Sequence, residues 1–171
     1  VQMLTENIPN YRGAASPYGL GYVPGPWMQS IQVSKGISSV KNGYEAITGQ
    51  INVEFKKPQL LEADWVSANL FASSTNWYEA NADATLKLSK RWSTSLLAHY
   101  ENETKAHDGN DDGFVDIPQV EQYNVWNRWA YMGDHYVFQA GFKALSESRT
   151  SGQAHHTDMQ TGDRYKVGID T

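Results

Sequence analysis

The fold of this chain is decided by residues 77–89, which read WYEANADATLKLS. Every second position from Tyr78 to Leu88 carries Tyr, Ala or Leu, and the positions between them carry only polar or charged side chains. Successive side chains of a β-strand point to opposite faces of its sheet. Residues 77–89 are therefore predicted to form a strand with one apolar and one polar face. This strand would be longer than the usual strand of about 5–6 residues in soluble sheets.

Alternating segments also lie on both sides of this strand. The same pattern predicts strands over 66–72, 92–101 and 136–144, and a further strand over 123–132 whose two faces the pattern does not distinguish.

The predicted connections alternate in length. Residues 89–91 and 133–134 form tight turns, whereas residues 107–120 and 150–163 form long loops. Short turns at one end and long loops at the other are typical of outer-membrane β-barrels. A soluble β-sandwich with one buried face also fits the alternation, but the strand length and the loop asymmetry favour the barrel.

Composition narrows the function classes. The chain has 171 residues, a formal net charge of -5 and no cysteine. Scattered Lys and Arg argue against a nucleic-acid partner, because phosphate binding needs clustered cations. The sequence has no apolar run long enough to predict a transmembrane helix. Six Trp, ten Tyr and five Phe suit a barrel, which places aromatic side chains in girdles at the membrane interfaces.

Residues 1–58 differ from the rest of the chain in composition and in the length of their predicted strands. They are rich in Gly and Pro, and they predict loops over 10–26, two strands over 28–33 and 50–55, and a short helical turn or a loop over 38–45. Proline commonly ends a strand because it cannot donate to the ladder. We therefore place a domain boundary after Lys56-Lys57-Pro58, with domains 1–58 and 59–171.

Two segments of the first domain carry a family resemblance. Residues 27–36 read WMQSIQVSKG, residues 42–53 read NGYEAITGQINV, and Lys56-Lys57 follows. Together they resemble the end of the plug domain of TonB-dependent outer-membrane receptors, in particular those of Bacteroidetes. Two positions depart from the family pattern, because Lys35 stands where Arg is usual and Thr48-Gly49 replaces Gly-Gly.

The resemblance implies an all-β fold. Residues 1–58 would be the C-terminal part of the plug domain. Residues 59–171 would be the first five or six antiparallel strands of a transmembrane β-barrel that has about 22 strands in the full-length family. Such a sheet has two open edges, so we expect the intact protein to continue past Thr171.

The resemblance also implies a function. The protein would be a receptor in the bacterial outer membrane that takes up a scarce nutrient (a metal chelate, cobalamin, haem or a glycan) by energy-coupled movement of its plug. It would not be an enzyme. TonB would bind through a segment upstream of Val1, outer-membrane lipid would surround the barrel, and a surface lipoprotein remains open as a further partner.

The alternative function is a secreted soluble all-β module that binds calcium or carbohydrate. The two readings differ in the apolar face, which a soluble sandwich must cover with a second sheet and a barrel must leave bare toward lipid. An enzyme would need catalytic carboxylates within 108–116, and their spacing fits a metal loop better.

A calcium loop is predicted over residues 108–119. Calcium prefers a dense set of oxygen ligands, and Gly113 supplies the sharp turn that such loops contain. The loop departs from an EF-hand because Gln119 replaces the final Glu and no helix flanks it. An acidic, solvated loop tip is the alternative. The predicted ligands of a structural Ca2+ are Asp108, Asn110, Asp112, the Phe114 carbonyl and Asp116.

Substrate contacts are predicted in residues 11–27, because the resemblance places this segment on the outer face of the plug. Aromatic rings stack on ligands and hydroxyls hydrogen-bond them, although the same side chains could instead pack against the barrel wall. The predicted substrate-binding residues are Tyr11, Arg12, Tyr18, Tyr22 and Trp27.

Histidine and carboxylate side chains, which can bind metals, also occur together in two other places. His155 and His156, with Asp158, lie in a polar stretch where solvated side chains are commoner than ligands. On the strands, the lumen-lining reading is preferred for Glu79, Asp83, His99 and Glu101.

Overall fold

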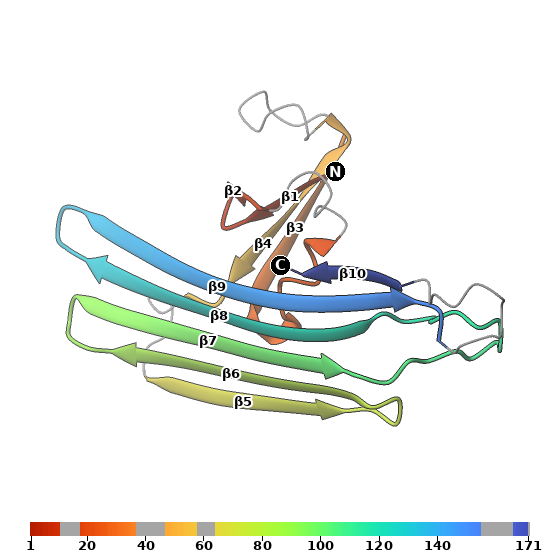
Figure 1. Cartoon of the computed structure of the whole chain (residues 1–171). Coiled ribbons are helices and arrows are strands. Elements are labelled where there is room, and N and C mark those ends of the chain that lie inside the picture. The colour runs from red at the N-terminus through yellow and green to blue at the C-terminus, as the bar shows by residue number, and fades with distance from the viewer. Residues whose placement is uncertain (11–17, 37–46, 58–63, 155–165, 171) are drawn as a thin grey trace. The chain divides into compact units, whose positions relative to one another are not determined.

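The computed structural model describes residues 1–10, 18–36, 47–57, 64–154 and 166–170 (Figure 1). The chain divides into two compact units, Val1–Ala63 and Asp64–Thr171. The sequence predicts a domain boundary after Pro58, and residues 58–63 lie outside the described residues.

The first unit contains a four-stranded sheet of order β2-β1-β4-β3. Strand β4 pairs in parallel with β1 and antiparallel with β3. The strands predicted over 28–33 and 50–55 are confirmed as β3 and β4, whereas β1 was not predicted because its residues do not alternate. The strands are β1 (Gln2–Thr5), β2 (Ile8–Pro9), β3 (Met28–Lys35) and β4 (Gly49–Phe55).

The core of the first unit centres on Trp27 and Phe55. Trp27 ends a short 3-10 helix, η2 (Gly25–Trp27), which interrupts the predicted loop just before β3. Both rings are fully buried and meet edge to face at 5.8 Å between centroids. Such aromatic pairs add stability beyond the area they bury. The core also contains Met3, Leu4, Tyr22, Val23 and Val53.

The second unit is a six-stranded antiparallel sheet in which each strand pairs with the next one along the chain. The predicted strands are all confirmed, and those near the middle of the sheet are longer than expected. No helix among the described residues is long and apolar enough to cross a membrane. The strands are β5 (Trp65–Ala72), β6 (Trp77–Lys87), β7 (Trp92–Glu103), β8 (Gln119–Met132), β9 (Val137–Gly152) and β10 (Lys166–Asp170).

The connections of the second unit differ between its two ends (Figure 1). At one end, β6 and β7 are joined by a turn closed by the Leu88 N–H on the Trp92 carbonyl at 3.0 Å. The β8–β9 turn at the same end is closed by the Gly133 N–H on the Tyr136 carbonyl at 2.9 Å. The opposite end has the long loop of residues 104–118 and also the tight β5–β6 turn, which is closed by the Ser73 N–H on the Trp77 carbonyl at 2.8 Å, so short turns are not confined to one end. We call these the short-turn end and the loop end.

The two faces of the six-stranded sheet have an inverted burial pattern. Polar side chains are buried on one face, with Asn81 4% and Gln122 0% exposed. Apolar side chains are exposed on the other, with Leu86 42% and Phe142 70% exposed. The inner faces of soluble sheets carry the opposite arrangement. We call these the polar face and the apolar face.

Strand β8 shows why its faces could not be assigned from the sequence. Gln122 and Arg128 are buried on the polar face, while Tyr123 and Trp129 are exposed on the apolar face. Between them the pattern reverses, because the register places Trp126 on the polar face and Asn127 on the apolar one. These two exchanged side chains hide the alternation.

Trp126 is accommodated by a glycine on the neighbouring strand. A Cβ atom added to Gly141 would lie 2.6 Å from Cζ2 of Trp126. The Arg128 guanidinium lies over the same indole ring, 5.7 Å from its centroid. The missing side chain at Gly141 therefore leaves space in which Trp126 lies between β9 and Arg128.

Replacing Gly141 by valine is expected to displace Trp126 and to destabilise the sheet by about 1–3 kcal/mol, the usual cost of overpacking. The measurement is urea unfolding of the intact protein in detergent micelles, followed by tryptophan fluorescence. Ala140→Val on the exposed apolar face is the matched control and should change little. Equal stability of the two variants would contradict the packing described for Trp126.

Candidate functional site

The polar face contains a histidine held between two carboxylates. Nδ1 of His99 lies 2.8 Å from Oδ1 of Asn81, whose Nδ2 donates to Glu79 at 2.7 Å. The imidazole nitrogens are 3.7 Å from Glu79 and 3.6 Å from Glu101. The cluster forms because Glu79 pairs with Glu101, and Asn81 with His99, across β6 and β7.

A second acidic side chain on this face is fully partnered. Asp83 accepts hydrogen bonds from the Trp65 indole at 3.0 Å and from the Ser67 hydroxyl. Both donors come from β5, where Ser67 is the register partner of Asp83. Hydrogen bonds offset much of the cost of removing a carboxylate from water.

A third cluster connects β8 to β9. Glu147 is 3% exposed and accepts a hydrogen bond from Gln122 at 2.6 Å. Arg149 donates to both oxygens of Glu147, at 3.0 and 3.3 Å. A bidentate Arg–carboxylate pair of this kind is a strong, charge-assisted interaction.

The polar face has hydrogen-bonding capacity beyond these clusters. Among the described residues, Oγ of Ser95 and Oε1 of Glu103 are buried there without a hydrogen-bond partner. Buried polar atoms usually find a partner in protein or in ordered water. The part of the chain that the structure describes contains no group of three His, Asp or Glu side chains arranged to hold a metal. The face is thus suited to water and polar ligands.

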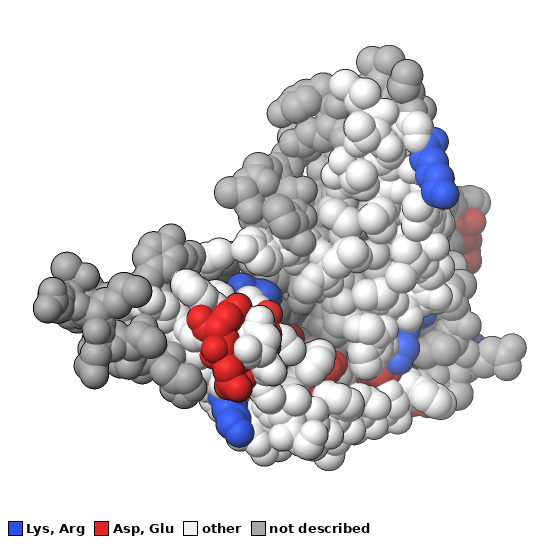
Figure 2. All heavy atoms as spheres, turned by 90° about the vertical axis from the view of Figure 1, so that its right-hand side faces the viewer, with Lys and Arg blue, Asp and Glu red and all other residues white. Residues whose placement is uncertain are grey.

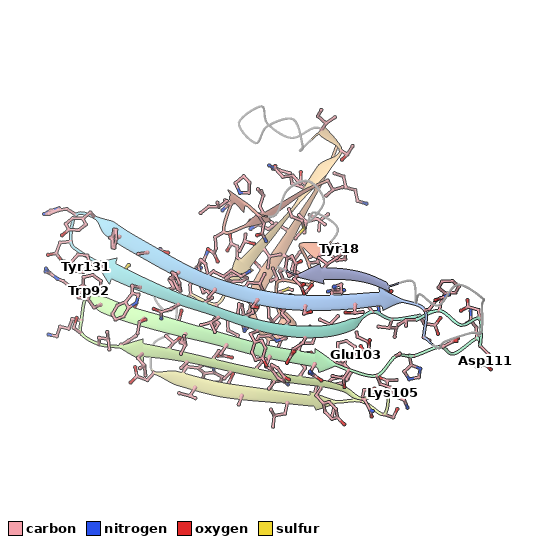
Figure 3. The ribbon with its side chains drawn as sticks, in the orientation of Figure 1. Tyr18, Trp92, Glu103, Lys105, Asp111 and Tyr131 are labelled. Carbon is pink, nitrogen blue, oxygen red and sulfur yellow. The ribbon has the colours of Figure 1, made fainter. Side chains whose placement is uncertain are left out.

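The apolar face contains aromatic clusters near both ends. Near the short turns, the Trp92 and Tyr131 rings lie 5.0 Å apart, and Tyr131 stacks on Tyr136 at 5.4 Å (Figure 3). Toward the loop end, Tyr100 meets Tyr123 at 4.9 Å. Such rings, with an apolar body and a polar tip, favour the boundary between hydrocarbon and water.

The two aromatic clusters are separated by about the thickness of a membrane band. Trp92 and Tyr100 are on the same strand, roughly 26 Å apart along it at ~3.3 Å a residue. At the ~40° strand tilt of outer-membrane barrels, this length would correspond to about 20 Å along the barrel axis, near the ~25 Å apolar band of such barrels.

Polar atoms on the apolar face satisfy one another. Nδ2 of Asn127 donates to Thr94 Oγ1 at 3.2 Å and to the Ser95 carbonyl at 2.9 Å, and its Oδ1 accepts from the Trp129 indole at 2.7 Å. The Thr94 hydroxyl donates to the Arg128 carbonyl at 2.9 Å. Polar groups inside a bilayer need such internal partners.

The predicted calcium loop lies at the loop end, between β7 and β8. Figure 3 shows Asp111 at its tip, and Figure 2 shows a cluster of acidic side chains on the face seen from that end. The loop is closed by a bridge between His107 and Ile117, and Gly113 has a φ of 85°. This left-handed conformation suits glycine.

Oxygens of the predicted ligands turn toward the loop's own backbone. Asp108 accepts from the Gly113 N–H at 2.8 Å, and Asp112 accepts from the Phe114 N–H at 2.8 Å. Asp116 accepts from the Gly109 N–H at 2.7 Å. Asn110 donates to the second oxygen of Asp112 at 3.0 Å. In the described structure the three carboxylates of Asp108, Asp112 and Asp116 are not gathered around one point, and calcium binding by these residues, Asn110 and the Phe114 carbonyl stays a prediction.

The structure describes three of the five predicted substrate-binding residues. Tyr11 and Arg12 lie outside the described residues, and Tyr18 is partly exposed. Tyr22 and Trp27 are 1% and 0% exposed and belong to the core of the first unit. The sequence left open that these side chains pack against the barrel wall; packing against the wall and ligand contact both stay predictions. His155, His156 and Asp158 also lie outside the described residues.

The sequence did not predict the Glu147 cluster. A signal was present in the sequence, since Glu147 and Arg149 are polar residues spaced by two on β9, and Gln122 on β8 is the register partner of Glu147. The exchanged pair Trp126 and Asn127 obscured the pattern in β8, and the predicted β9 ended at Ala144, before this cluster.

Comparisons with known proteins show the fold. No protein-family model and no curated protein matches the sequence. Among solved structures, the pyoverdine outer-membrane receptor FpvA of Pseudomonas aeruginosa PAO1 matches with a TM-score of 0.63 at 17% identity, over 88% of this chain and 21% of the receptor.

Further receptors match equally well. The ferric-catecholate import receptor Fiu of E. coli K12 matches with a TM-score of 0.63 at 17% identity, over 88% of this chain and 20% of its own. The siderophore receptor PiuA of Acinetobacter baumannii matches with a TM-score of 0.63 at 14% identity, over 88% of this chain and 19% of its own. This chain thus spans about a fifth of their length, and it has the all-β fold of plug and barrel parts of TonB-dependent receptors.

Proposed function

We propose that this chain is part of an outer-membrane receptor that takes up a scarce nutrient by energy-coupled movement of its plug. The observation that carries this proposal is the inverted burial of the six-stranded sheet. Exposed Leu, Val, Trp and Phe side chains lie on the face between the two aromatic clusters, while hydrogen-bonded polar side chains are buried on the other face. In an outer-membrane barrel the apolar face contacts lipid and the polar face lines a water-filled lumen, which accounts for this arrangement.

The soluble alternative is disfavoured by the same face. Monomeric soluble proteins rarely expose contiguous apolar patches beyond a few hundred Å². Here the exposed set extends over β6 to β9 and contains Tyr78, Leu86, Leu96, Val125, Trp129, Phe138 and Phe142. A secreted calcium- or carbohydrate-binding module would need to cover it with a second sheet.

The proposed substrate is a ferric siderophore. The matching structures are of a pyoverdine receptor, a ferric-catecholate import receptor and a siderophore receptor. These proteins are receptors and not enzymes, which supports the prediction that this protein catalyses no reaction. Cobalamin, haem and glycans are the other substrates that the proposed receptor class admits. TonB would act through a segment upstream of Val1, and a surface lipoprotein is a further proposed partner.

The function is tested by uptake. Deleting the gene of the intact protein is expected to abolish energy-dependent uptake of a radioactive ferric siderophore by the native cells, and a wild-type copy should restore it. The panel should include several siderophores together with labelled cobalamin, haem and oligosaccharides. If the deletion abolishes uptake of another panel member and not of the siderophores, that compound is the substrate and the siderophore proposal is wrong. Unchanged uptake of every member would contradict the receptor function.

Contact between the apolar face and lipid is tested by comparing the folding free energy that an introduced arginine costs at two positions along this face. Leu96→Arg places a cation between the two aromatic clusters and is expected to cost about 2–4 kcal/mol of folding free energy, as at a bilayer midplane. Leu88→Arg, beside the β6–β7 turn, is the matched control and should cost ~0–1 kcal/mol. Stability is measured by urea titration of the intact protein in phospholipid vesicles. Similar small costs at both positions would argue against lipid contact.

The calcium proposal predicts a rigid loop. Calcium is expected to bind the intact protein in detergent micelles and to protect residues 104–118 from proteolysis, since a bound ion would join four side chains and one carbonyl. Asp108→Asn and Asp112→Asn should each weaken binding several-fold by calorimetry. Asp134→Asn, at the short-turn end, is the matched control. If calcium neither binds nor protects the loop, the loop is an acidic solvated tip.

A further inference from the structure

Among the described residues of the first unit, β1 and β4 form a parallel strand pair. Gln2 is the register partner of Gln50, and Thr5 is the partner of Val53. The other strand pairs among the described residues are antiparallel. In a parallel pair both strands begin at the same end, so the N-terminal end of β1 lies far from the C-terminal end of β4.

A side-chain hydrogen bond joins the N-terminal end of β1 to β4. Gln2 and Gln50 are 3% and 8% exposed, and Nε2 of Gln50 donates to Oε1 of Gln2 at 2.8 Å. Amide side chains are rarely buried, and here the two satisfy each other across the parallel pair.

The turn after β1 fastens its other end. Glu6 and Asn7 have φ angles of 55° and 63°, the left-handed conformation of a tight hairpin turn. The Glu6 N–H donates to the Val53 carbonyl at 2.9 Å, and the Glu6 carboxylate accepts from the Phe55 N–H at 2.7 Å. The Asn7 N–H donates to Asn52 Oδ1 at 2.9 Å.

Chain connectivity decides how these bonds respond to tension. A pull on the chain upstream of Val1 acts on the N-terminal end of β1, while the second unit is attached beyond the C-terminal end of β4. The two ends are opposite, so the strands are loaded in shear. The ladder bonds and the fastenings at both ends of β1 then carry the load together and must break nearly at once.

The antiparallel pair β3–β4 has the reverse property. Met28, at the start of β3, is the register partner of Phe55, at the end of β4. Once β1 is detached, the pull reaches Met28 beside the point where β4 is anchored. The β3–β4 bonds then open one at a time from that end, as in a zipper, and resist little.

From this geometry we propose that the β1–β4 pair is the mechanical clamp of the first unit. Its fastenings by Gln2–Gln50 and by Glu6 and Asn7 set the force at which β1 leaves, and β3 follows at a lower force. The biological use of the clamp rests on the proposed function, in which TonB pulls from upstream of Val1. The clamp itself follows from register and connectivity alone (Figure 1).

The clamp is tested by pulling single molecules of the intact protein in detergent micelles. This chain contains no cysteine, so handles are attached at cysteines introduced at chosen positions. Handles at Val1 and Lys57 load β1–β4 in shear, and handles at Thr5 and Lys57 load the same bonds from adjacent ends. The rupture force is expected to be several-fold higher in the first geometry. Equal forces would overturn the clamp, whether or not the protein transports anything.

A disulfide bond between β1 and β4 tests whether uptake requires β1 to leave β4, separately from whether the protein is a receptor. Met3→Cys with Ile51→Cys joins register partners of β1 and β4. The oxidised variant is expected to bind ferric siderophore normally but to lose uptake, and reduction should restore uptake. Full uptake by the oxidised protein would overturn the release of β1 while leaving the receptor function intact. If the wild-type protein transports nothing, the proposed function fails and the pulling comparison still decides the clamp.

Discussion

Backbone pairing is the constraint on which this structure depends. A chain that crosses hydrocarbon must satisfy every N–H and C=O group internally, and neighbouring strands do this only in a sheet. Pairing fixes the alternation of side chains, so each strand presents one face outward and one inward. Residues 78–88 show the consequence most clearly, because Tyr, Ala and Leu occupy one face and polar residues occupy the other.

The same constraint explains the exceptions. Asn127 lies on the apolar face, but its amide hydrogen bonds go to Thr94 and the Ser95 carbonyl, and its oxygen accepts from Trp129. Trp126 lies on the polar face, where Gly141 leaves space for the ring. Each exception has a local partner on an adjacent strand.

Alternation made most of the fold predictable, and local deviations limit the rest. The predicted strands of the second unit are present, and both predicted strands of the first unit are found. Strand β1 was missed because three consecutive residues, Gln2, Met3 and Leu4, are all buried. The polar clusters depend on cross-strand register, which a sequence specifies only weakly. Burial of Tyr22 and Trp27 depends on packing that no local pattern encodes.

The most direct test of the central claim is the accessibility of single cysteines along β9. Cysteines at Phe138, Ala140 and Phe142 sample the apolar face, and those at Gln139 and Lys143 sample the polar face. Each is spin-labelled in the intact protein in phospholipid vesicles and probed with oxygen and with a water-soluble nickel chelate. Oxygen is expected to reach the first set and the chelate the second, with a period of two. Loss of that alternation, or chelate access to the first set, would contradict a lipid-facing apolar surface.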